Sequence, residues 1–121
     1  MPWRTIPFFF DGGGSALSGT ITRCTSITFG GVINKFFVQA DQSGSATITV
    51  KTVASGSYTG PGSASDISNG GEAMANVITK SDTTLAGWMT ALAPDTTVCI
   101  SLSNPSTATW LSGYVRVQEG R

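Results

Sequence analysis

The sequence predicts an all-β fold, an antiparallel and jelly-roll-like β-sandwich of seven to eight short strands with little or no helix. Ser, Thr and Gly make up 47 of the 121 residues (15, 17 and 15), whereas only 12% of the residues are charged. Such a composition favours strands and turns over helices. Several segments also alternate apolar and polar residues with a period of two, as half-buried strands do. The length fits one domain covering residues 1–121.

Residues 32–53 are predicted to form a central β-hairpin with which the other strands pack. One face of its two arms is expected to hold Val32, Phe36, Val38 and Ala40, followed by Ala46, Ile48 and Val50. The opposite face of the first arm is expected to hold Ile33, Phe37 and Gln39. Between the arms, residues 41–45 are short and polar and include a glycine, which suits a tight turn.

Two shorter strands are predicted before this hairpin. In residues 5–10, Ile6, Phe8 and Phe10 share one face, and Pro7 restricts this segment to a sheet edge or to an arm paired on one side. We expect a short N-terminal arm over residues 1–7. Residues 19–23 form a further strand, and residues 27–29 begin another that bends at a pair of glycines.

After the hairpin the pattern becomes irregular. Residues 54–71 hold almost no apolar side chains besides Tyr58 and Ile67, which predicts a long surface loop. Loops of this length are often functional, but a passive insertion explains the composition equally well. Residues 72–80 fit either a helix or a strand, and we favour a strand or irregular structure.

The C-terminal third predicts two further strands. Pro94 and Asp95 fit the central positions of a type I turn that leads into a strand at residues 97–103. In the closing strand, residues 108–118, alternation points one set of side chains inward and the other outward. The inward set is Leu111, Val115 and Val117, and the outward set is Trp110, Tyr114 and Arg116.

The residues that usually carry chemistry are scarce. The chain has no histidine, so the usual general base is missing, and its acids sit beside Gly, Ser, Thr or Pro as turn-capping residues do. Cys24 and Cys99 lie far apart in sequence; two free thiols are favoured, and a disulfide stays open. We therefore predict a protein that is not an enzyme, with no catalytic residue, no metal site and no cofactor.

The charge pattern also limits the classes of molecule that this protein is expected to bind. Seven basic residues balance seven acidic ones without clusters, which is weak ground for binding nucleic acid. The apolar run at residues 6–10 is too short for a signal peptide or a membrane span, so no membrane partner and synthesis in a cytoplasm are expected.

Exposed aromatic residues give the candidate interface. An outward Trp110 beside Tyr114 would form an apolar patch of the kind used for subunit contact or for stacking sugars. The alternative is that the tryptophans pack over the end of the sandwich. The full set of candidate interface residues is Trp3, Arg4, Ile6, Phe9, Tyr58, Trp110 and Tyr114.

Four segments resemble a β-sandwich module found in virion proteins of tailed bacteriophages. They are FFFDGGGSALSGT at 8–20, ADQSGSATITV at 40–50, TLAGWMTALAPDT at 84–96 and YVRV at 114–117. The resemblance extends from Phe8 to Arg121. It departs from the commoner pattern after residue 50, where many members of the family have an aspartate, a tryptophan and a lysine before a proline-rich stretch.

The resemblance implies a virion structural protein without enzymatic activity. A small stand-alone chain of this kind is expected to be a capsid decoration or cement protein, a trimer seated on the major capsid protein at the head surface. The alternative is a receptor-binding or glycan-binding module of a tail fibre or spike, which would use the 54–71 loop and exposed aromatic residues.

Overall fold

A computed structural model describes residues 3–119 and consists of strands joined by loops and two short 3-10 turns. The elements are β1 (Trp3–Asp11), β2 (Ile21–Ile27), β3 (Gly31–Ala54), η1 (Ser55–Ser57), η2 (Pro61–Ser63), β4 (Ser65–Asp66), β5 (Glu72–Asp82), β6 (Ala91–Leu92), β7 (Thr96–Ser103) and β8 (Trp110–Glu119). All strand pairings are antiparallel. The predicted all-β class is confirmed. No helix among the described residues is long and apolar enough to cross a membrane.

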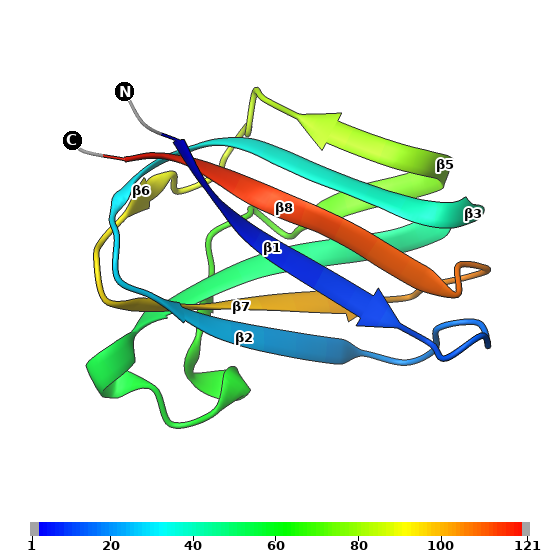
Figure 1. The fold of residues 1–121 in the computed structure, drawn as a ribbon, viewed down its shortest axis with the longest axis horizontal. Coiled ribbons are helices and arrows are strands. Elements are labelled where there is room, and N and C mark those ends of the chain that lie inside the picture. Colours follow the sequence, from blue (N-terminus) through cyan, green and yellow to red (C-terminus); the bar gives the residue numbers. More distant parts are fainter. Residues whose placement is uncertain (1–2, 120–121) are drawn as a thin grey trace.

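Strand β3 organises the molecule, but not as a hairpin. Its first part, up to Ala40, pairs with β8, and its last part, from Thr47, pairs with β7. β5 pairs with both parts along their other edge. Because both edges of each part are already occupied, the two parts cannot pair with each other. Figure 1 shows β3 crossing the molecule, bending round and returning.

The predicted hairpin over residues 32–53 is therefore wrong in its pairing, although the chain does reverse direction at residues 41–45. The physical reason is that alternation with a period of two records which side chains are buried and carries no information about which strand lies alongside.

The pairings define two packed layers in a jelly-roll order. One layer runs β1-β8-β3-β5 and the other runs β2-β7-β3-β5, with β3 and β5 passing from one layer to the other at the bend. Counting each of these two strands once per layer gives four strands a layer, the arrangement of a double-sheet jelly roll. The sequence-based prediction of a jelly-roll-like sandwich agrees with this topology.

Apolar side chains from both layers meet in the core. The largest fully buried ones include Phe10, Phe36, Ile48, Leu102, Leu111, Val115 and Val117. One predicted face assignment fails at the start of β3, where Ile33 is buried and Val32 is 43% exposed. A shift in the pairing register between Ile33 and Lys35 explains the failure, because a bulge exchanges the inward and outward sides of a strand.

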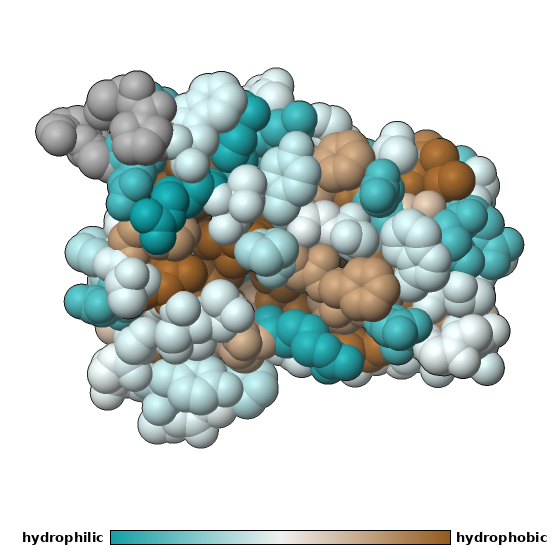
Figure 2. Space-filling view, viewed as in Figure 1, coloured by the Kyte–Doolittle hydropathy of each residue, from teal (hydrophilic) through white to brown (hydrophobic). Residues whose placement is uncertain are grey.

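β1 lies at an edge of its layer, as the proline predicted, and pairs with β8 from Trp3 to Asp11. The described part of the predicted N-terminal arm, residues 3–7, is therefore strand rather than a free arm. Residues 1 and 2, and the basic C-terminal residue 121, lie outside the described residues. Figure 2 shows apolar residues gathered in a band across this side of the molecule, which β1 crosses diagonally in Figure 1.

Three local predictions have clear outcomes. Residues 72–80 lie in strand β5. The 54–71 loop runs over the surface, but Ile67 and Ser68 are buried and fasten its end to β3, where the backbone N–H of Val50 donates to Ser68 Oγ (3.0 Å). The Pro94–Asp95 turn is not type I, because Asp95 has φ +58° where a type I turn needs a negative value.

The two cysteines form a disulfide, so the favoured pair of free thiols was the wrong alternative. Cys24 in edge strand β2 stands directly opposite Cys99 in β7, with 4.0 Å between their Cα atoms. The sequence does not reveal this pairing because 75 residues separate the two positions.

Candidate binding face

The outer surface of the β1-β8-β3 layer carries a group of aromatic side chains. Adjacent outward positions of the three strands bring together residues that lie far apart in the sequence. We call this surface the aromatic face. Its members are Trp3, Phe9, Phe37, Trp110 and Tyr114, with the cationic side chains Lys35 and Arg116 between them.

The rings are arranged in contacting pairs. Phe9 stacks on Trp110 with 6.2 Å between ring centroids, and Phe37 stacks on Tyr114 at 5.5 Å. Trp3 and Phe9 are 56% and 51% exposed, so large apolar surfaces face outward. Stacked aromatic rings hold one another in place, so little side-chain freedom remains to be lost when a partner covers them.

Cations complete the face. The guanidinium of Arg116 lies 3.8 Å from the centre of the Trp3 ring, and its Nε–H donates to Asn34 Oδ1 (2.8 Å). Lys35 Nζ lies 5.7 Å from the Phe37 ring and 5.8 Å from the Tyr114 ring. These are cation–π contacts, which orient the charged groups along the aromatic surface.

Four of the predicted interface residues belong to this face: Trp3, Phe9, Trp110 and Tyr114. Ile6 does not belong to an interface, because it points inward from β1 and is only 2% exposed. Arg4 lies at the inner side of the same strand, where its guanidinium covers the Phe29 ring at 4.5 Å and contacts Glu119 at 3.6 Å.

Phe37, Lys35 and Arg116 are the residues of this face that the predicted interface did not include, although Arg116 was expected to point outward. The expected alternation placed Phe37 correctly on the side opposite Phe36, and the register shift before Lys35 moved Ile33, not Phe37, to the other side from the one expected. The signal for adding Phe37 to the predicted interface is the pair Phe36-Phe37, since only one of two adjacent strand residues can enter the core and the other must be an outward aromatic side chain.

The acidic residues behave mostly as the sequence predicted, as turn caps. Asp11 accepts a hydrogen bond from the backbone N–H of Gly13 (2.9 Å). Asp41 accepts from Thr109 Oγ1 (2.6 Å) and from the Thr109 backbone N–H (2.9 Å), and the hydroxyl bond in particular lowers the pKa of Asp41. Across residues 3–119 no three acidic or cysteine side chains gather in a metal-binding arrangement.

Glu72 is the exception, a carboxyl group that is 6% exposed at the sandwich edge formed by β5. Trp88 Nε1–H donates to its Oε2 (3.0 Å), and the Trp88 ring packs 6.0 Å from Phe36. Burial, followed by a hydrogen bond with Asp82 and the charge of Asp82, raises the pKa of Glu72 to about 7. Bonding to Glu72 in turn lowers the pKa of Asp82. Trp88 thus packs against the core at the edge of the sandwich, whereas Trp3 and Trp110 lie on the aromatic face, so the alternative in which all three tryptophans pack over the end of the sandwich does not hold.

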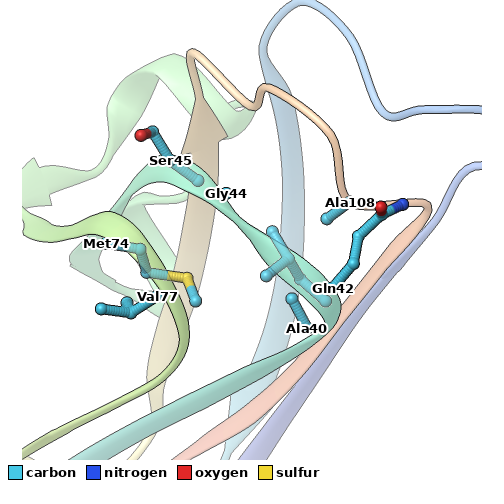
Figure 3. Close-up of a pocket in the computed structure, with 9 residues that line it drawn as sticks. Ala40, Gln42, Gly44, Ser45, Met74, Val77 and Ala108 are labelled. Carbon is cyan, nitrogen blue, oxygen red and sulfur yellow. The ribbon is translucent and has the colours of Figure 1, made fainter.

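The described surface includes a small cavity and an open groove. A cavity at the bend of β3 leaves about 10 Å³ for the centre of a water molecule, and Figure 3 shows Met74 and Val77 of β5 facing Ala40 and Gln42 of β3 around it. The second hollow is an open groove of about 170 Å³ by the same measure. It is lined by Cys24, Thr25, Ser26, Tyr58 and Thr97. We call it the Tyr58 groove.

No protein-family model matches the chain, and no curated protein sequence matches it. Among solved structures, a serine protease of Aeromonas sobria aligns with 98% of this chain at 9% identity and a TM-score of 0.37. This chain spans only 27% of that protease chain. The Anabaena sensory rhodopsin transducer aligns over 88% of this chain and 97% of its own, at 11% identity and a TM-score of 0.41.

A third structure, TmCBM61 in complex with β-1,4-galactotriose, aligns over 96% of this chain and 86% of its own, at 9% identity and a TM-score of 0.36. At TM-scores this low, none of these likenesses carries an argument about function.

Proposed function

We propose that this chain is a structural protein of a bacteriophage particle, without enzymatic activity, that decorates the head by seating its aromatic face on the major capsid protein. The observation that carries the proposal is the aromatic face itself. It is an exposed, ring-stacked surface on the flat side of a sheet. Exposed apolar surfaces of this kind mark protein interfaces, and aromatic and arginine side chains supply most of the binding energy there.

The charge of the chain agrees with this function. With seven acidic and seven basic residues, the protein has no net charge to steer it to nucleic acid or to repel neighbouring copies on a crowded shell. The segments at residues 11–15 and 40–45, on which the resemblance to phage virion proteins rests, form a turn after β1 and the bend of β3, and their aspartates cap backbone N–H groups. Such turns support the sandwich and leave the docking role to its outer face.

The first test is the copy number of this chain in purified particles, normalised to the major capsid protein by quantitative mass spectrometry. About one copy per capsid subunit is expected for a cement protein. A few copies per hundred capsid subunits would assign the chain to the tail instead, and absence from particles would overturn the proposal.

The second test asks whether the aromatic face makes the contact. Particles lacking this protein are mixed with purified Phe9→Ser/Trp110→Ser variant, and bound protein is measured after sedimentation. Because both side chains lie on the aromatic face, we expect a loss of binding of at least tenfold. Ile78→Ser is the matched control, since Ile78 is 46% exposed and belongs to β5. Equal binding by the two variants would exclude the aromatic face as the docking surface.

A further inference from the structure

We propose that the Tyr58 groove is a binding site for one neutral pyranose unit, held by stacking on the Tyr58 ring and by hydroxyl hydrogen bonds. Sugar binding at this groove is a function separate from docking through the aromatic face, and the proposal does not depend on that docking. Thr97 and Ser26 belong to β7 and β2 of the other layer, whereas the aromatic face lies on the β1-β8-β3 layer. The two surfaces can therefore be altered separately.

The groove is built from anchored parts. Its floor is the ladder between β2 and β7, where the Cys24–Cys99 disulfide fixes the distance between the strands. Its wall is Tyr58, the residue that follows η1, and the Tyr58 backbone N–H donates to the Ser55 carbonyl (3.3 Å). The Ser55 backbone N–H donates in turn to the Asp95 carbonyl (3.0 Å), which ties the wall to the start of β7. A site held in this way needs little ordering when a ligand enters.

The chemistry of the lining selects the ligand class. All five lining residues are uncharged, which disfavours an ionic ligand because no opposite charge would replace its lost hydration. Ser26 Oγ lies 3.3 Å from Thr97 Oγ1, which lies 3.0 Å from Ser55 Oγ. Each hydroxyl can both donate and accept, as sugar hydroxyls can.

Tyr58 supplies the apolar part of the site. Its side chain is 39% exposed beside the groove, so a large part of the ring is free to take a ligand. The C–H face of a pyranose is apolar, whereas its rim carries hydroxyls, and this combination matches an aromatic ring beside a row of Ser and Thr side chains. The Tyr58 groove leaves about 170 Å³ for the centre of a water molecule, whereas the cavity at the bend of β3 leaves about 10 Å³. Of these two, the groove is the one that can admit a ligand larger than a water molecule.

The test is a titration of the isotope-labelled full chain with methyl α-glucoside and methyl β-galactoside, followed by backbone amide chemical shifts. We expect saturable shifts, with dissociation constants in the millimolar range, centred on Ser26, Tyr58 and Thr97. Glucuronate at equal concentration should bind more weakly because the groove offers its carboxylate no cation. Absence of saturable shifts with both neutral sugars would overturn the proposal.

Variants then localise the site. Tyr58→Ala should weaken binding at least fivefold, whereas Tyr58→Phe should retain it because stacking needs only the ring. Trp110→Ser on the aromatic face is the matched control and should bind as the unaltered protein does. If Trp110→Ser abolishes the shifts and Tyr58→Ala does not, sugars bind the aromatic face and the groove proposal is wrong. Particle binding by Tyr58→Ala reports separately on the proposed function.

Discussion

At the scale of the residue, Glu72 makes the stability of this protein depend on pH. Burial of its carboxyl group, together with the hydrogen bond and the charge of Asp82, raises its pKa from 4.5 to about 7, although the hydrogen bond from Trp88 acts in the opposite direction. A carboxyl whose pKa is higher in the folded state stabilises the fold fully below its unfolded pKa. This contribution is lost as the pH rises through the folded value.

We therefore expect the free energy of unfolding to fall by about 1–3 kcal/mol between pH 5 and pH 8. Urea unfolding at several pH values measures this change in the free energy of unfolding. This pH range lies above the one in which three other carboxyl groups lose their contributions to stability. They belong to Asp41, Asp66 and Asp82, whose pKa values are lowered. Glu72→Gln should remove the dependence, whereas Glu119→Gln at the surface should keep it. A protein equally stable at pH 5 and pH 8 would contradict this account.

Gly113 is the second residue whose role is specific. It lies in the middle of β8, where a Cβ atom would overlap the Phe37 carbonyl oxygen and approach Phe8 Cζ to 2.6 Å. The missing side chain is what allows the Phe8 ring to lie against β8 inside the core.

Gly113→Ala should therefore destabilise the fold by about 1–3 kcal/mol or more, the usual cost of overpacking a core. Chemical denaturation gives the value. Gly62→Ala serves as the control, because a Cβ at that position meets nothing within 4 Å, and its effect should stay within about 0.5 kcal/mol. Equal effects of the two substitutions would show that the space around Gly113 is not limiting.

At the scale of the element, β2 depends on the disulfide more than any other long strand. It is an edge strand that pairs only with β7, and the Cys24–Cys99 bond joins the middle of the two. Edge strands with one neighbour open at lower cost than central strands do. The bond therefore stabilises one of the two edges of its layer.

Reduction should lower the free energy of unfolding by about 2–4 kcal/mol. Amide exchange should accelerate first in β2, while the amides of β8 stay protected. The double variant Cys24→Ala/Cys99→Ala should behave like the reduced protein and should not respond to a reductant. Unchanged exchange in β2 after complete reduction would rule out this role of the disulfide.

The elements also show what a sequence of this kind can and cannot predict. Positions and faces within single strands were predictable: Leu111, Val115 and Val117 point inward from β8, and Trp110 and Tyr114 point outward. The pairing of one strand with another was not predictable. The alternation over residues 32–53 fits a hairpin as well as a strand that changes layers, and a single bulge near Lys35 placed Ile33 rather than Val32 in the core.

At the scale of the whole molecule, the jelly-roll class followed from strand number and turn spacing, but the candidate sites did not. The aromatic face needs β1, β3 and β8 side by side, and the Tyr58 groove needs a loop folded against β2 and β7. Both arise from pairings between distant segments. The disulfide belongs to the same class of feature, because residues 24 and 99 meet only after β2 has found β7.

The order of the strands has a consequence for how the chain is made on the ribosome. β1 pairs only with β8, β2 only with β7, and every partner of β3 follows it in the sequence. The first 54 residues thus emerge as three strands that have no partner among themselves. Closure waits for β7 and β8, so the nascent chain exposes its apolar faces until these strands have left the ribosome, and we expect chaperones that hold the chain until then to raise its yield in a cell.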